Sequence, residues 1–278
     1  MRTAKKLRRI DASSGMKKAA RAVLFALLSL ALPLSDAHAE SRKCLSFKFA
    51  AKAWLPKNDS EDGITVIQKW PNAAIIKVRV TLDDMTMQNN EIEKIEQIRS
   101  QITSWFQLAN LGVRFFDQGD ADTDYVLVLT TDVEGYIGKK LDYVGGFLLS
   151  SPAIKEGLAS LTEVERARFS DPAVIVARIK KAGGCGSFYI ANNAVIVRSY
   201  SLIDVGKPVL CAQVAISEAM GVLNAPSFAY LMNFPNEIIT DEQRSFFLSK
   251  TVALLYSDKI KIGLNRADAT AALEEMCK

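Results

Sequence analysis

The first 39 residues of the chain constrain its fold most, because their pattern predicts that they are not part of the folded protein. Basic residues precede an apolar run over residues 22–34, and Ala37-His38-Ala39 follows. A basic start, a short apolar core and an A-x-A ending are typical of a secretory signal peptide. We therefore expect a bacterial, Sec-type signal that is cleaved after Ala39. Residues 1–15 are either an extension of its basic start or a misassigned beginning ahead of Met16.

Cleavage after Ala39 would remove His38, the only histidine of the chain. Histidine is the usual general base near neutral pH and the commonest zinc ligand. A chain that begins at Glu40 therefore cannot form a Ser-His-Asp or Cys-His site, nor a His-Glu-x-x-His zinc site. Serine–lysine catalysis needs no histidine, but Ser249-Lys250 lies on an apolar stretch without companion motifs. We expect no catalytic residue, no cofactor and no metal ion.

The basic character of the chain belongs mostly to the expected signal. Eight of the 35 Lys and Arg residues and two of the 31 Asp and Glu residues precede Glu40, which leaves 27 basic and 29 acidic side chains and a net charge of −2. This balance argues against a nucleic-acid partner, whose phosphates attract a basic surface. The remaining 239 of the 278 residues suit one large domain. No later apolar run reaches the roughly 20 residues of a membrane span.

Four cysteines follow the expected cleavage point: Cys44, Cys185, Cys211 and Cys277. An even count in an exported chain indicates disulfides, although four cysteines allow three pairings. We expect Cys185–Cys211 together with Cys44–Cys277, because the second bond would tie down both ends of the mature chain. Four buried free thiols are the alternative. No Cys-x-x-Cys spacing occurs, so neither a zinc ribbon nor a thioredoxin-like redox site is indicated.

Hydrophobic periodicity predicts an α+β fold in which helices pack on a mixed sheet. Alternating or short apolar runs indicate strands at residues 45–49, 75–80, 111–116, 125–129, 188–190 and 194–198. Helical spacing and capping residues indicate helices from Asn89 or Asn90 to about 106, from Pro208 to Gly221, from Thr240 to Tyr256, and from Asn265 to about Cys277.

The middle of the chain has a weaker pattern. Residues 136–151 contain Gly145-Gly146 and are expected to form a loop or a hairpin. Thr162, with a glutamate three residues later, favours a short helix that Pro172 ends. We therefore expect an irregular insert around residues 136–180 within a single domain over residues 40–278.

The later part of the chain carries short motifs in a fixed order. They are Cys211, Ile216-Ser217-Glu218, Gly221-Val222-Leu223-Asn224, Met232-Asn233-Phe234, Ile239-Thr240-Asp241 and Leu254-Leu255-Tyr256-Ser257-Asp258, with Lys69-Trp70 earlier in the chain. Together they resemble the proteobacterial secreted family known as domain of unknown function 2927. In that family a cysteine precedes a pair of glutamates, a glutamine, Leu-Gly-Leu and Asn-Asp. The resemblance covers most of residues 40–278, and its matching letters lie toward the C-terminus.

The resemblance implies a zincin-like architecture, in which a strand leads into the helix that carries His-Glu-x-x-His in active metallopeptidases. Two ligands at that spacing share a helix face and bind zinc, while the glutamate activates water. In this chain the matching stretch is Val214-Ala215-Ile216-Ser217-Glu218. Val214 therefore stands where a ligand is needed, and Ala215 where the base is needed. The resemblance implies a degenerate site.

Glu218 is the one carboxylate that remains in this stretch. It either lines the floor of a vestigial groove together with Gln213 and Asn224, or it is a solvated residue or one hydrogen-bonded to a neighbouring strand edge. Two other patterns have plain interpretations. Residues 183–186 are glycine-rich but lack the lysine of a phosphate-binding loop. The acidic residues 117–124 lack the glycine and glutamate of an EF-hand and are expected to form an exposed turn.

These features predict an exported, catalytically inactive, metallopeptidase-like protein in the bacterial periplasm or secreted from it. It would bind an unknown protein or peptide partner of the cell envelope and would have no membrane span after cleavage. The alternative is a carboxylate-dependent hydrolase, for example one directed at glycans, built from Glu218 and acids such as Asp204 or Glu237. A glycosidase needs two carboxyl groups about 5–10 Å apart across a cleft.

Overall fold

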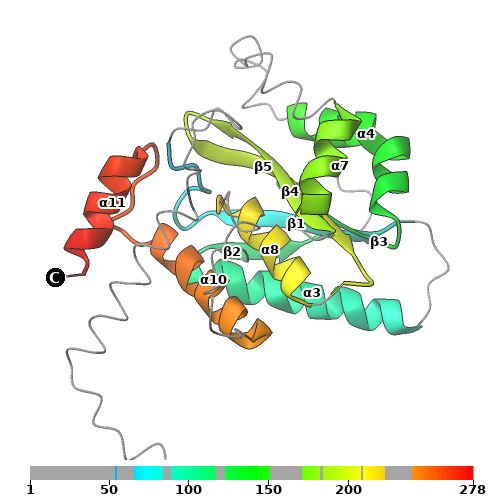
Figure 1. Cartoon of the computed structure of the whole chain (residues 1–278), viewed down its shortest axis with the longest axis horizontal. Helices are drawn as coiled ribbons and strands as arrows, with labels where there is room; N and C mark the ends of the chain where they lie inside the picture. Colours follow the sequence, from blue (N-terminus) through cyan, green and yellow to red (C-terminus); the bar gives the residue numbers. More distant parts are fainter. Residues whose placement is uncertain are drawn as a thin grey trace, which may run out of the picture. The chain divides into compact units, whose positions relative to one another are not determined.

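The computed structural model describes residue 54 and residues 66–83, 89–116, 123–150, 171–181, 184–207, 209–222 and 240–277 (Figure 1). All of them belong to the second of two compact units, Cys44–Lys278. The expected signal peptide, the strand at 45–49 and the helix after Thr162 lie outside the described residues. Within the described ranges, no helix combines the length and the apolar character that a membrane crossing requires.

The described residues form five strands and six helices, so the predicted α+β class is confirmed. The strands are β1 (Ile75–Leu82), β2 (Gly112–Phe115), β3 (Tyr125–Thr130), β4 (Cys185–Asn192) and β5 (Val195–Asp204). The helices are α3 (Asn89–Leu108), α4 (Val133–Leu149), α7 (Pro172–Lys181), α8 (Val209–Ala219), α10 (Asp241–Leu255) and α11 (Arg266–Glu275).

The strands form one mixed sheet in the order β2-β1-β3-β5-β4. The first four of these run parallel to one another, whereas β4 is antiparallel to β5. Parallel neighbours need a crossover connection, and α3 provides the one between β1 and β2. β4 and β5 instead form a hairpin. Its turn residues Asn193 and Ala194 have φ values of 49° and 64°, and a type I′ turn requires positive φ at both positions.

The sheet separates two hydrophobic clusters. Side chains of α3, α8, α10 and α11 contribute to the first cluster, and side chains of α4 and α7 contribute to the second (Figure 1). Along β3, Tyr125, Leu127 and Leu129 belong to the first cluster, and Val126 and Val128 belong to the second. This alternation is the two-residue period of a strand. Because both faces are covered, β3 is buried at every position, and its sequence is apolar from Tyr125 to Leu129.

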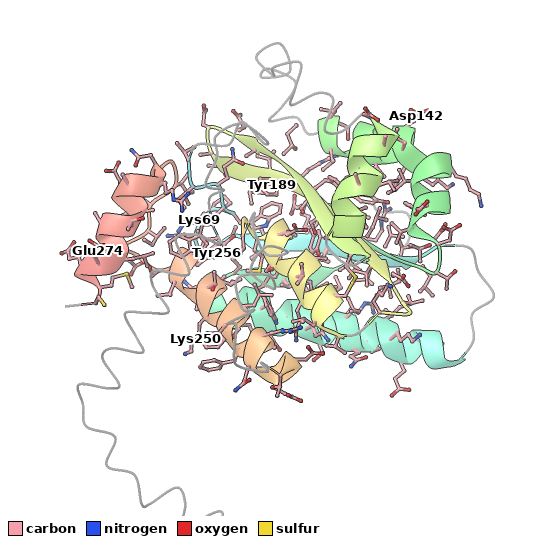
Figure 2. All side chains as sticks on the ribbon, viewed as in Figure 1. Lys69, Asp142, Tyr189, Lys250, Tyr256 and Glu274 are labelled. Atoms are coloured by element: carbon pink, nitrogen blue, oxygen red, sulfur yellow. A yellow bond between two sulfur atoms is a disulfide. The ribbon has the colours of Figure 1, made fainter. Side chains whose placement is uncertain are left out.

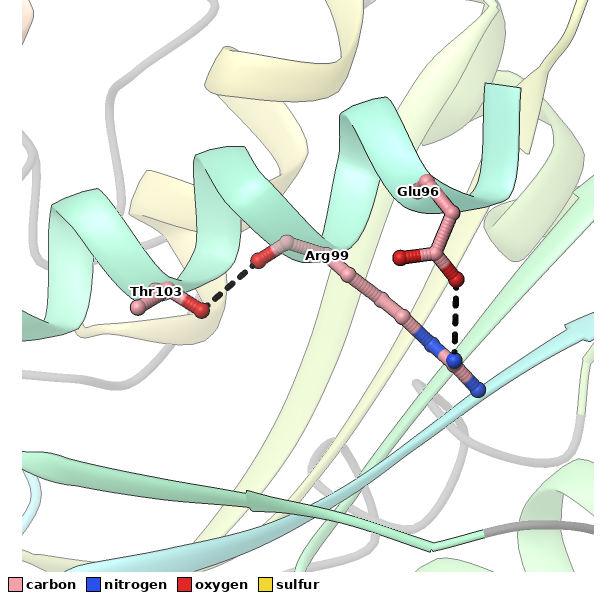
Figure 3. A network of polar contacts seen from close by, with 3 residues as sticks. All are labelled: Glu96, Arg99 and Thr103. Atoms are coloured by element: carbon pink, nitrogen blue, oxygen red, sulfur yellow. Dashed lines mark hydrogen bonds and ion pairs between the residues drawn. The ribbon is translucent and has the colours of Figure 1, made fainter. Parts of the chain in front are cut away.

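Helix α3 is held in place mainly by its apolar side. Ile98 and Ile102 are buried in the first cluster. Along another side of the helix, Arg99 Nη1 lies 3.0 Å from Glu96 Oε1, and Thr103 Oγ1 donates to the carbonyl of Arg99 at 2.9 Å (Figure 3). Such an ion pair along a helix contributes only about 0.2–0.5 kcal/mol. The buried isoleucines therefore determine how the helix sits on the sheet.

The loop or hairpin expected at residues 136–151 is wrong, because α4 occupies most of that stretch. Asp132 caps the helix, and its Oδ1 accepts the N–H of Gly135 at 2.9 Å. Glycines within a helix cost about 1 kcal/mol each relative to alanine. Burial against the sheet offsets that cost. The buried side chains of α4 in the second cluster are Tyr136, Ile137, Val144 and Leu148.

The irregular insert expected around residues 136–180 is also wrong where the structure describes it. Pro172 begins α7, and Asp171 Oδ1 accepts the N–H of Ala173 at 2.8 Å. A proline at the first helical position lacks only an N–H that would have no helical partner, so the same residue suits a helix start. The other predicted strands and helices within the described residues are confirmed, although β5 extends beyond 198 to Asp204.

Candidate functional site

Helix α8 carries the stretch in which the sequence places a degenerate site. The helix ends before Gly221, which has a left-handed φ of 99° and donates its N–H to the carbonyl of Glu218 at 2.9 Å. A Cβ at Gly221 would lie 2.1 Å from the carbonyl oxygen of Gln68. Only glycine therefore fits at this helix end, and the segment before β1 packs directly against it.

The three motif positions of α8 are all buried: Val214 is 6% exposed, Ala215 0% and Glu218 1%. Glu218 Oε2 accepts the backbone N–H of Ser187 on β4 at 2.9 Å. Among the described strands β4 pairs only with β5, so the carboxylate satisfies a group on the outer edge of the sheet. The hydrogen bond agrees with the interpretation of Glu218 as a partner of a strand edge. Its burial contradicts the interpretation as a solvated residue.

A line of hydroxyl groups continues from Ser187 under α8. Ser187 Oγ donates to the carbonyl of Ala215 and contacts Ser201 Oγ, which lies 2.8 Å from Tyr125 Oη. Every proton has an acceptor if Tyr125 donates to Ser201, Ser201 to Ser187, and Ser187 to Ala215. Burial raises the pKa of the Tyr125 phenol above its ordinary value, and the Glu218 charge adds to the shift, against the hydrogen bond with Ser201. The phenol therefore stays protonated.

A disulfide joins α8 to the same strand. Cys185, at the start of β4, is bonded to Cys211, with their Cα atoms 5.4 Å apart, so this predicted pairing is confirmed. Cys277 is also disulfide-bonded. Cys44, its expected partner, lies outside the described residues. Helix α8 is thus held to β4 both covalently and through Glu218.

Lys69 is a second buried charge on this side of the sheet. Its side chain is 1% exposed, and Nζ donates to the carbonyls of Leu255 at 2.9 Å and Ile260 at 2.8 Å. It lies 5.2 Å from the centroid of the Tyr256 ring, and Figure 2 labels both residues near the end of α10. The last carbonyls of a helix lack helical partners and carry partial negative charge. The ammonium therefore caps α10.

Trp70 and Tyr256 complete an arrangement that we call the clasp, which consists of Lys69, Trp70 and Tyr256. Trp70 Nε1 donates to the carbonyl of Ala219 at 2.9 Å, and its backbone N–H donates to Tyr256 Oη at 3.1 Å. Tyr256 Oη in turn donates to the carbonyl of Met220 at 2.9 Å. The clasp joins the segment before β1 to the ends of α8 and α10. Three of the residues that carry the family resemblance thus have a structural role, because each donates a hydrogen bond to carbonyl groups at a helix end.

Gln213 and Asp204, the other candidate residues that the structure describes, do not join Glu218. Gln213 is half-buried, and its Oε1 has no hydrogen-bond partner within the described structure. Asp204 Oδ1 accepts the N–H of Gly206 at 2.8 Å in a turn. Asn224, Glu237, Gly183 and the acidic residues 117–122 lie outside the described residues. In the part of the chain that is described, no three His, Cys, Asp or Glu side chains are grouped to hold a metal ion.

No family model, curated protein or solved structure matches this chain. The resemblance to the domain of unknown function therefore stays a prediction. The geometry around α8 is therefore the observation that bears on function.

Sequence patterns did not identify Ser187 as the partner of Glu218, or Ser201 and Tyr125 as the hydroxyl groups that continue from Ser187. Ser187 and Ser201 lie opposite each other in the β4–β5 register. Small polar residues in otherwise apolar strands mark positions where a helix can approach closely and a hydroxyl can bond to it. Periodicity alone does not fix the register that brings the two serines together.

Proposed function

We propose that this chain is an exported, catalytically inactive, zincin-like protein that acts by binding a protein or peptide partner in the bacterial envelope. The observation that carries the proposal is the environment of Glu218. This carboxylate is buried and accepts an N–H of β4. A hydrolytic carboxylate must reach substrate and water, whereas a carboxylate in this place serves the packing of α8 on the sheet.

The order of the elements supports the zincin-like part of the proposal. β5 is followed directly by α8, which is the strand-to-helix layout that the resemblance implies. Val214 and Ala215 both pack in the first cluster. A catalytic zinc needs about three protein ligands. The apolar side chains at these two positions supply neither a ligand nor a base.

The disulfide supports export. Disulfide bonds persist mainly in oxidising compartments such as the bacterial periplasm, and Cys185–Cys211 is built into the packing of α8 against β4. Cleavage of the signal and residence in the envelope are part of the same proposal.

The carboxylate-dependent hydrolase receives less support. Its central acid, Glu218, is 1% exposed, and the side chain of Asp204 is engaged with the N–H of Gly206. A pair of catalytic carboxyl groups must face each other across an open cleft. A buried Glu218 does not meet that requirement.

The proposal is tested on protein purified from the exported fraction under oxidising conditions. We expect far less than one zinc per chain, no cleavage of a general peptidase substrate, and saturable retention of a defined partner from envelope extract. Glu218→Gln is the matched variant, because the amide oxygen can still accept the Ser187 N–H; it should retain the partner as the wild type does. Tightly held stoichiometric zinc with chelator-sensitive cleavage would overturn the proposal. So would any hydrolytic activity that disappears in Glu218→Gln.

A further inference from the structure

The opposite face of the sheet carries a polar cluster that the proposed function does not use. We call it the Arg79 cluster; its members are Arg79 on β1, Tyr136 and Tyr143 on α4, and Tyr200 on β5. Arg79 Nη2 donates to Tyr143 Oη, and the hydroxyls of Tyr136 and Tyr200 are hydrogen-bonded to each other. The rings of Tyr143 and Tyr200 meet edge to face, with centroids 6.5 Å apart. The two hydrogen-bonded pairs therefore form one cluster.

The Arg79 cluster has more donors than acceptors among the described residues. Tyr143 Oη accepts from Arg79, which leaves its own proton unused, and the Tyr136–Tyr200 pair has two protons for one hydrogen bond. Arg79 Nε is buried and has no hydrogen-bond partner in the described structure. A buried donor without a partner is destabilising, and native proteins commonly fill such a position with a water or an ion.

The cluster is also cationic. Burial raises the pKa of both Tyr136 and Tyr200, and the Arg79 charge opposes that shift at each of them, so the guanidinium acts on both hydroxyls. Among the described residues, the carboxylate that acts on Tyr136 is Asp83, and its Oδ2 already accepts from Thr130 Oγ1 at 3.3 Å. The hydroxyls remain protonated donors beside a positive charge.

The Arg79 cluster has a buried side and a solvent-exposed side. Tyr200 and Tyr136 are 0% and 6% exposed, whereas Tyr143 is 47% exposed and Arg79 is partly exposed. The Phe147 ring also packs on Tyr200, with centroids 5.8 Å apart. Buried aromatic rings thus form the inner side of the cluster, and Tyr143 and Arg79 form its solvent-accessible side.

We propose that the Arg79 cluster binds an oxyanion, the carboxylate or phosphate group of a small ligand or of a partner. A guanidinium presents a planar fork that matches two oxygens of such a group. The tyrosine protons without acceptors are further hydrogen-bond donors for the same anion. The site lies across the sheet from α8. The proposal of an anion site can therefore be tested independently of the proposed function.

The test is a titration of the oxidised protein with sodium phosphate, sodium sulfate and sodium acetate at constant ionic strength, followed by NMR at the arginine Nε–H groups and the amides of α4. At least one anion should give a saturable shift of the Arg79 Nε–H signal, whereas chloride should give none. Preference for acetate would assign a carboxylate ligand, and preference for phosphate or sulfate would assign a tetrahedral one. Arg79→Gln should weaken binding about tenfold or more, and Tyr143→Phe, which keeps the ring, should weaken it a few-fold.

Arg114→Gln is the matched control. Arg114 lies on the neighbouring strand β2 opposite Lys77, hence on the same face as Arg79, and its guanidinium is 4.9 Å from the Phe116 ring. The substitution removes one positive charge without touching the tyrosines, so affinity should stay unchanged. Absence of a saturable shift with all three anions, or equal weakening in Arg114→Gln, overturns the proposal. If Arg79→Gln does not fold, unchanged affinity in Tyr143→Phe overturns it as well.

Discussion

The two faces of the sheet differ in how their buried polar groups are paired. Beneath α8, Glu218 accepts an N–H and the hydroxyl protons of Tyr125, Ser201 and Ser187 run in line to a carbonyl. On the opposite face, the Arg79 cluster keeps donors without acceptors among the described residues. A fully satisfied network makes a core rigid, whereas a partly satisfied one is costly unless something else binds there. The motif residues that the sequence points to thus stabilise the fold. The donors without acceptors lie on the opposite face, where the sequence shows no motif.

The clasp should show the largest effect on stability. Trp70 is 2% exposed and bonds to the end of α8. Trp70→Ala should lower the free energy of unfolding by about 3–5 kcal/mol, because it opens a cavity and leaves the Ala219 carbonyl without its donor. Trp70→Phe should lower it less, since a ring remains in place. Urea unfolding followed by circular dichroism measures both. If Trp70→Ala leaves the free energy of unfolding unchanged within the error of the measurement, the clasp is not part of the first hydrophobic cluster.

The Cys185–Cys211 disulfide should have the next largest effect on stability. Cys185 and Cys211 are separated by 26 residues, and a bond that closes a loop of this size stabilises the folded chain by about 3 kcal/mol. The double variant Cys185→Ser, Cys211→Ser should therefore unfold at lower urea concentration than the oxidised wild type. Anion binding at the Arg79 cluster should not change, because the bond lies on the other face. A parallel loss of anion affinity would show that the two faces are not independent.

The buried ammonium of the clasp predicts a smaller, pH-dependent effect. Burial, and next the charge of Lys261, lower the pKa of Lys69 from 10.5 to about 8, against the charge of Asp258. Between these values the unfolded chain binds more protons at this site than the folded chain, so stability rises with pH. We expect a gain of about 1–2 kcal/mol between pH 7.5 and 9.5. Above pH 10 the gain should reverse, because burial raises the pKa of Tyr125 and Tyr256 above their ordinary value.

The variant Lys69→Met distinguishes the titration of Lys69 from that of the other ionisable groups. The pH-dependent gain should disappear in it, whatever its absolute stability. Lys250→Met is the control, since Lys250 is exposed on α10, and it should keep the gain. Urea unfolding at both pH values provides the measurement. An unchanged slope in Lys69→Met would contradict the assignment of the titrating group.

Local sequence patterns predict much of this fold because the interactions concerned are local. Thr240 and Gln243 form the expected capping box at the start of α10, and Asn265 caps α11 as predicted. Helix α4 could not be predicted in the same way. Its glycines disfavour a helix, and the burial that compensates for them depends on a sheet whose strands are distant in the sequence.

The candidate site shows the same division. The α8 stretch is recognisable because Val214, Ala215 and Glu218 have the spacing of a motif. What Glu218 does there depends on Ser187, which reaches it through the β4–β5 hairpin and the packing of α8 on the sheet. Spacing along a helix fixes which side chains share its face. It does not specify whether that face meets a strand or solvent.

The most direct test of the structural role of Glu218 is the stability of three variants of α8, measured by urea unfolding under oxidising conditions. Glu218→Ala should lower the free energy of unfolding by about 2–3 kcal/mol, because it leaves the Ser187 N–H buried without an acceptor. Glu218→Gln should cost less than half of that, and Gln213→Ala, on the same helix, should change almost nothing. If instead Glu218→Ala is as stable as the wild type or more so, Glu218 is kept for function at the expense of stability, and the account of this face is contradicted.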